Sequence, residues 1–139
     1  MATKIRAEIS QKNKYYIDKH RHYELKHFCL QYPTWKKAHS DCLTADVPMS
    51  MIDGARQNDG VYDPTSARAI TRAHYSRRIE LLEQVARDAD KYLWTYILKA
   101  VTEGLSYTYL RTKLGIPCGK DMYYDRYRKF FWLLSEVRD

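Results

Sequence analysis

Residues 90–139 decide the predicted fold, and they read DKYLWTYILKAVTEGLSYTYLRTKLGIPCGKDMYYDRYRKFFWLLSEVRD. Apolar residues recur in this stretch at intervals of three and four, which is the period of a helix with one buried face. Two glycines divide the pattern into three parts. Because glycine accepts the left-handed backbone conformation that closes a helix, Gly104 should end the first helix and Gly115 the second. We therefore expect three helices joined by two short turns.

Each of these predicted helices has a start signal or an apolar face of its own. The first should run from Lys91 to Glu103, with an apolar face made of Leu93, Ile97, Ala100 and Val101. Ser106 can cap the second, since its hydroxyl accepts from a backbone N–H of the first turn. The third should begin at about Lys120, with an apolar stripe made of Tyr123, Tyr127, Phe130, Leu134 and Val137. Helix, glycine turn and helix is the layout of a helix-turn-helix.

In a helix-turn-helix the last helix enters the major groove of duplex DNA and reads base edges near its N-terminal end. With the apolar stripe turned inward, the outward side carries the predicted base contacts Lys120, Asp121, Tyr124, Asp125 and Arg128. Four further cations would bind phosphates, which add affinity rather than sequence choice: Arg111, Lys113, Arg126 and Lys129. The two aspartates count against DNA, because carboxylates repel phosphates unless they accept from cytosine. The alternative is three packed helices with a charged, solvated face.

The run GLSYTYLRTKLGIPCGKDMYYDRYRKFFWLL at residues 104–134 resembles the C-terminal, sigma-region-4-like helix-turn-helix of small phage-encoded transcriptional regulators, including the late-operon activator type. Those regulators usually carry Ser or Thr after the turn glycine and its hydrophobic neighbour, whereas this turn continues through Pro117, Cys118 and Gly119 and is one residue longer. The resemblance implies a phage protein that binds duplex DNA and controls transcription in the cytoplasm of a host cell. The N-terminal helices would then serve as a platform for a homodimer or for contact with host RNA polymerase.

The charge of the chain favours an anionic partner. Its 139 residues carry a formal net charge of +7, and the excess lies at the two ends, with nine basic and four acidic residues in 1–43 and seven and four in 104–139. Nucleic acid is the commonest anionic partner of a small basic protein. No apolar stretch is long enough to cross a bilayer, and the N-terminus lacks the apolar run of a secretory signal, so we expect a cytoplasmic protein without a membrane partner.

The whole pattern predicts an all-α protein, a compact helical bundle of one domain. The expected order is N-terminal helices in 1–43, a loop in 44–63, a long helix in 64–89 and the helix-turn-helix in 90–139. Pro33 should begin the second N-terminal helix, because proline fits a first turn but not a helix interior. Asp63 can cap the long helix, and Asp59-Gly60 permits a hairpin in the loop before it.

The long helix carries a seam that needs a partner, either a helix of the same chain or a second copy of it. The seam consists of Tyr75, Ile79, Leu82, Ala86, Ala89 and Leu93. The opening residues up to Lys14 fit an arm, an electrostatic tail or a short helix equally well. Trp132 lies opposite the apolar stripe of the last helix, so it either contacts the N-terminal helices or anchors a protein partner.

Chemical sites are sparse in this sequence. Cys29 and Cys42 lie within apolar helical patterns, which is typical of buried reduced thiols, and Cys118 makes their number odd. Four histidines lie near the first two cysteines, but the ligand pairs of a zinc site are missing, so we expect neither metal nor cofactor. No glycine-rich phosphate loop, serine elbow or pair of carboxylates is present, and we expect a non-enzymatic protein.

A second interpretation assigns the same face to a protein partner. A phage-encoded inhibitor that binds a host protein, such as a CRISPR nuclease or RNA polymerase, can retain a helix-turn-helix as a scaffold, because a fold does not determine a function. Asp121, Asp125 and exposed aromatic side chains fit a protein interface as well as a DNA groove.

Overall fold

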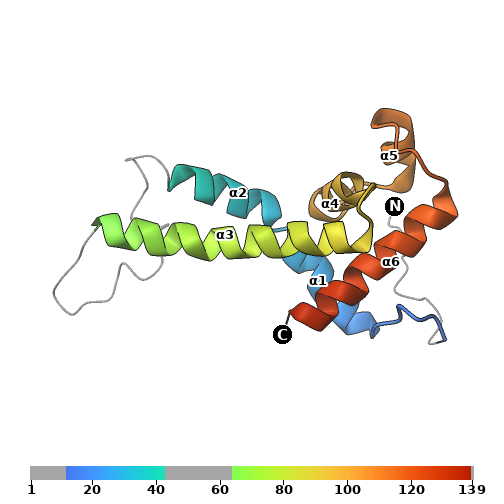
Figure 1. Ribbon diagram of the computed structural model, residues 1–139, viewed down its shortest axis with the longest axis horizontal. Coiled ribbons are helices and arrows are strands. Elements are labelled where there is room, and N and C mark those ends of the chain that lie inside the picture. Colours follow the sequence, from blue (N-terminus) through green and yellow to red (C-terminus); the bar gives the residue numbers. More distant parts are fainter. Residues whose placement is uncertain (1–11, 43–63, 139) are drawn as a thin grey trace. The chain divides into compact units, whose positions relative to one another are not determined.

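The computed structural model describes residues 12–42 and 64–138, and all regular structure in these two ranges is α-helical (Figure 1). The helices are α1 (Lys19–Cys29), α2 (Tyr32–Asp41), α3 (Pro64–Ala89), α4 (Trp94–Glu103), α5 (Tyr107–Lys113) and α6 (Lys120–Val137). The predicted all-α class is confirmed. The predictions of a loop in 44–63, of its hairpin, of the Asp63 cap and of an arm before Lys12 lie outside the described residues.

The chain divides into two compact units. The small unit, within residues 32–81, contains α2 and the first part of α3. The large unit, within residues 1–31 and 82–139, contains α1, the last turns of α3, and α4, α5 and α6. Every residue of the predicted DNA face belongs to the large unit.

In the small unit, Trp35, Ala38 and Cys42 of the α2 region are buried, as are Ala67 and Thr71 of α3. The guanidinium of Arg78 lies 5.5 Å from the centre of the Trp35 ring, so a cation covers the indole. The helix begins at Tyr32, one residue before the predicted start at Pro33. This difference is small because proline remains in the first turn, where its missing N–H costs no hydrogen bond.

In the large unit α4 is the central helix, since it contacts α1, α5 and α6, while α1 also contacts α6. The predicted apolar face of α4 is confirmed, because Leu93, Ile97, Ala100 and Val101 are all buried. Leu82, Ala86 and Ala89 of the predicted seam are buried within the same unit. The rest of its core comes from α1, α5 and α6 and includes Leu25, Cys29, Leu110, Ile116, Tyr123, Phe130, Phe131 and Leu134.

The turns between α4, α5 and α6 follow the predicted signals. Gly104 has φ 71° and ψ 36°, in the left-handed region, and the N–H of Leu105 donates to the carbonyl of Ala100 at 3.0 Å. The Ser106 hydroxyl accepts from the N–H of Tyr109 at 3.1 Å and caps α5. Gly115 also has a positive φ, of 65°. These residues set where each helix stops, and the buried side chains then fix how the helices pack.

Two predictions at the helix ends were wrong. The first C-terminal helix begins at Trp94 rather than Lys91, because the Asp90 carboxylate accepts from the N–H groups of Tyr92 and Leu93 at 2.8 and 2.9 Å and holds them in a turn. Val137, the last residue of the predicted apolar stripe, is 57% exposed. The last turn of α6 is covered by a polar group instead.

That polar group is Arg21 of α1. Its guanidinium donates to the backbone carbonyls of Ser135, at 3.2 Å, and of Arg138. The last carbonyls of a helix have no partner within the helix, so Arg21 supplies one from a distant part of the chain. The Arg138 side chain in turn lies over the Phe28 ring, 4.0 Å from its centre, which ties the end of α6 to α1.

Candidate nucleic-acid interface

Exposed cations lie along α5 and at the start of α6. Arg111, Lys113 and Lys120 are exposed, and within the described ranges neither lysine has an ion-pair partner. The Tyr107 and Tyr123 rings, 5.5 Å apart, hold the start of α5 against the first turns of α6. The Tyr107 hydroxyl also donates to the carbonyl of Cys118 at 2.7 Å and fixes the turn between the two helices. These cations therefore lie on one connected, rigid segment.

The backbone at the start of α6 adds to the positive character of this edge. Gly119 is the N-cap and supplies no side-chain hydrogen bond to the first turn, which also carries the carboxylate of Asp121. The first N–H groups of a helix have no acceptor within the helix and carry the positive end of its dipole. The space beside the Gly119 Cα is open, with no atom within 4 Å of where a Cβ would lie. The Cα of Gly119 is therefore open to solvent.

Two of the predicted site residues are engaged within the protein. Arg126 donates from Nε to Asp90 at 3.0 Å and from Nη1 to Asp125 at 2.6 Å. Burial raises the pKa of Asp90, but the N–H groups of Leu93 and Tyr92 and the Arg126 guanidinium outweigh burial and hold the pKa below its usual value. Arg126 and Asp125 thus anchor α6 to the segment between α3 and α4, and their charges partly cancel.

Tyr124 lies elsewhere than expected. It was predicted on the outward side of α6, but it is half-buried, with its ring centre 5.0 Å from that of Tyr123 and 6.5 Å from that of Tyr107. Arg128 and Lys129 are half-exposed, and the Nε of Arg128 is buried without a hydrogen-bond partner among the described residues. The exposed members of the predicted face are therefore Lys120, Asp121, Arg111 and Lys113, of which Arg111 also donates to the carbonyl of Ile116 at 3.4 Å.

Trp132 is half-buried and contacts the segment before α1. Its ring lies 5.9 Å from that of Tyr15. Of the two alternatives drawn from the sequence, the structure supports contact with the N-terminal region.

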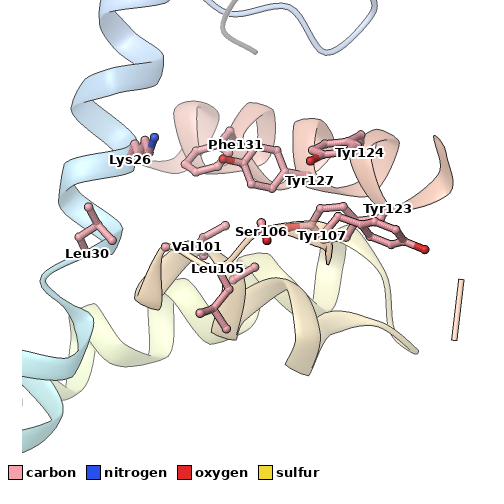
Figure 2. Close-up of a pocket in the computed structure, with 12 residues that line it drawn as sticks. Lys26, Leu30, Val101, Leu105, Ser106, Tyr107, Tyr123, Tyr124, Tyr127 and Phe131 are labelled. Atoms are coloured by element: carbon pink, nitrogen blue, oxygen red, sulfur yellow. The ribbon is translucent and has the colours of Figure 1, made fainter. Parts of the chain in front are cut away.

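A cavity lies beside this candidate interface, and it was not predicted from the sequence. Its volume is about 130 Å³, and it opens between α1, the α4–α5 connection and α6 (Figure 2). Four tyrosines line it: Tyr107, Tyr123, Tyr124 and Tyr127. Burial is the main cause that raises the pKa of Tyr123, so this phenol stays neutral. The clustering of tyrosines at 123, 124 and 127 is the only sequence signal for the site, and a core helix gives the same signal.

Behind the cavity lies His22. Its ring packs against Phe131, with the centres 4.8 Å apart, and its Nε2 is buried without a hydrogen-bond partner in the described part of the chain. Burial, and then the charge of Lys26, lower the pKa of His22 from 6.5 to about 4. His22 is therefore a neutral, packed side chain at physiological pH.

The cysteines and histidines form no evident metal site in the parts of the chain that the structure covers. Cys29 and Cys42 are buried free thiols, as predicted, and Cys118 is half-buried. Within residues 12–42 and 64–138, no group of three His, Cys, Asp or Glu side chains is placed to hold a metal ion. In the same ranges no helix combines the length and apolar character that a membrane crossing requires.

Comparison with protein-family models, with curated proteins and with solved structures gave no match to this chain.

Proposed function

We propose that this protein binds duplex DNA through a C-terminal helix-turn-helix formed by α4, α5 and α6, and that it regulates transcription. The observation that carries the proposal is the edge formed by α5 and the start of α6. Left-handed glycines set its turns, an uncapped helix start adds backbone donors, and Lys113 and Lys120 carry charges that no carboxylate in the described ranges neutralises. Such a combination suits phosphates on both sides of a groove.

The proposed contacts differ in kind. Lys120 lies in the first turn of α6, where a reading helix meets base edges, and Arg128 lies two turns further along. Arg111, Lys113 and Lys129 would meet phosphates and supply affinity that depends on salt. Arg126 and Asp125 would act by holding α6 in place, since their contacts are within the chain. The resemblance of residues 104–134 to phage regulators favours transcription control in a host cell over other uses of DNA binding.

A salt titration tests this proposal. Binding of a fluorescent random duplex, measured by anisotropy, should weaken steeply with salt, because each phosphate contact releases counterions, while a single strand of the same length binds less well. Lys120→Ala and Lys113→Ala should each weaken duplex binding and reduce the slope of log affinity against log salt by about 1.

The matched control is Lys99→Ala. Lys99 is exposed on α4 but pairs with Glu103 at 3.0 Å, so its removal changes the net charge equally without removing a proposed contact. Equal effects of Lys99→Ala and Lys120→Ala would show that binding depends on the net charge of the protein and not on a contact made by Lys120. Absence of duplex binding at low salt would overturn the proposal.

A second function is favoured by one observation at the same edge. Met122 is 47% exposed beside the exposed Asp121, and Tyr109 of α5 is exposed as well. Exposed methionine and tyrosine with a carboxylate suit a protein interface, as in an inhibitor of a host CRISPR nuclease or RNA polymerase.

Asp121→Asn separates the two functions. Loss of a carboxylate should strengthen duplex binding if the edge meets phosphates, and should weaken a complex if the edge meets a basic protein. Asp125 is unsuitable for this test, because its replacement also removes the partner of Arg126.

A further inference from the structure

The tyrosine-lined cavity of the large unit has no role in the proposed DNA contacts. Its walls come from three segments that are far apart in sequence. Lys26 comes from α1 and Leu30 from its C-cap, Leu105 and Ser106 come from the α4–α5 connection, and the tyrosines come mostly from α6 (Figure 2). A concave site built by several rigid elements is the usual form of a small-molecule site.

The size of the cavity limits its occupant. A volume of about 130 Å³ is close to that of cavities of about 150 Å³ that hold one benzene ring. A single six-membered ring therefore fits, whereas a fused ring pair or a larger ligand would extend into solvent. A ligand that fills the cavity without leaving it is therefore limited to one ring.

The walls favour an aromatic ring over an aliphatic one. Tyr127 and Phe131 lie 5.1 Å apart, edge to face, and Tyr107 and Tyr124 lie near them. Aromatic rings prefer tilted contacts with other rings, because the positive edge of one meets the negative face of the next. Leu30, Val101 and Leu105 complete the cavity and favour an uncharged ring body.

The polar groups of the cavity favour an anion attached to that ring. Lys26 is the one charged side chain among the described lining residues, and it has no ion-pair partner in the described ranges. The Ser106 oxygen accepts from the N–H of Tyr109, which leaves the hydroxyl hydrogen to donate. An ammonium and a hydroxyl donor both seek an acceptor, and a carboxylate is the acceptor that also carries the opposite charge.

We propose that this cavity binds a small aromatic carboxylate, with its ring among the tyrosines, Phe131, Leu30 and Leu105 and its carboxylate on Lys26. The inference is independent of DNA binding, since it rests on the cavity alone.

The test is a titration of the 139-residue chain with three probes of similar size, in which NMR chemical shifts report binding. Benzoate carries the ring and the anion, benzyl alcohol the ring without the charge, and cyclohexanecarboxylate the charge without aromaticity. Benzoate should shift the signals of Leu30, Val101 and Leu105. It should bind up to about five-fold more tightly than benzyl alcohol, which lacks the ion pair, and more tightly than cyclohexanecarboxylate, which lacks the aromatic contacts. Equal binding of all three, or no shift at these residues, would overturn the proposal.

Two variants test whether the ligand binds in the cavity. Lys26→Met should weaken benzoate binding about five-fold and leave benzyl alcohol unchanged, while Lys19→Met on the exposed side of α1 should change neither. Leu30→Trp should fill the cavity and abolish binding of all probes. Because Leu30 is partly exposed, Leu30→Trp should fold. If Leu30→Trp does not fold, Lys26→Met tests alone whether benzoate binds in the cavity. Unchanged benzoate binding in Lys26→Met, or binding of a capped Glu-Phe dipeptide without binding of benzoate, would overturn the proposal in favour of another site or a protein partner.

Discussion

At the scale of single residues, burial decides the chemistry of His22. The side chain is 5% exposed and packs on Phe131, and its pKa falls to about 4. The folded protein therefore holds the imidazole neutral, whereas the unfolded chain binds a proton at the ordinary pKa of 6.5. A proton that binds only the unfolded chain favours unfolding.

His22 should make stability depend on pH in a defined window. Above pH 6.5 both states are neutral at this residue, and its contribution to stability is fully present. The free energy of unfolding should fall between pH 6.5 and about 4, with a slope of at most about 1.4 kcal/mol per pH unit from this group, and the slope should end below that range. Urea unfolding at a series of pH values measures the curve.

Two variants identify the group responsible for that slope. His22→Phe should remove the His22 part of the slope, since a similar ring remains without a proton site. His20→Gln, on the exposed side of the same helix, should leave it in place. A slope that survives in His22→Phe would assign the pH dependence to another group.

At the scale of helices, the ends of α4 and α5 follow local rules and could be predicted from sequence. Gly104, Ser106 and Gly115 act on their own backbone or on residues within one turn, so each signal is complete within a few positions. The start of α4 was missed because the Asp90 side chain competes with the helix for two N–H groups, and its ion pair with Arg126 is remote in sequence.

The candidate site shows the same division between local and remote partners. The exposure of Lys113 and Lys120 follows from helical periodicity, and it was predicted. The inward position of Tyr124 depends on Tyr107, and the cavity depends on Lys26 of α1 and on Leu30 at its C-cap. No local pattern in the sequence shows which distant side chain a residue will meet.

A matched pair of glycine variants tests the role of backbone conformation in this segment. Gly104→Ala should destabilise the protein by about 1 kcal/mol, because an alanine is strained at φ 71° even though its Cβ would meet only Leu30 at 3.9 Å. Gly119→Ser should not lower stability, since φ is −81°, the space is open and serine is a preferred N-cap residue. Chemical unfolding measures both, and equal losses would contradict a conformational role for Gly104.

At the scale of the whole molecule, the large unit is assembled from two separate parts of the chain. Residues 1–31 contribute α1, residues 82–139 contribute the remaining helices, and the small unit lies between them in sequence. Arg21 links the two parts, because it binds Glu24 within α1 and backbone carbonyls near the end of α6, and Arg138 adds a second link by pairing with Glu24 at 3.5 Å.

Arg21→Lys should loosen this link. A lysine keeps the charge but loses the forked geometry that serves several acceptors at once, so we expect a loss of about 1 kcal/mol in the unfolding of the large unit. Hydrogen exchange should show faster exchange in the last turn of α6, while α2 in the small unit is unaffected. Lys19→Ala, which removes an exposed cation of the same helix, is the control. Exchange that is unchanged in Arg21→Lys would show that the apolar contacts of α6 and the Arg138–Glu24 ion pair hold its end without Arg21.

The Arg21 contacts also bear on how the protein is made. Arg21 and its acceptors on α6 are separated by 114 and 117 residues. A ribosome releases α1 early, and the part of its apolar side that α6 covers stays exposed until α6 has been synthesised, whereas α4, which covers another part, emerges sooner. Contacts of such long sequence separation slow folding and leave the waiting segment open to aggregation. Until α6 has emerged, the newly made chain should therefore expose apolar surface of α1 that favours aggregation.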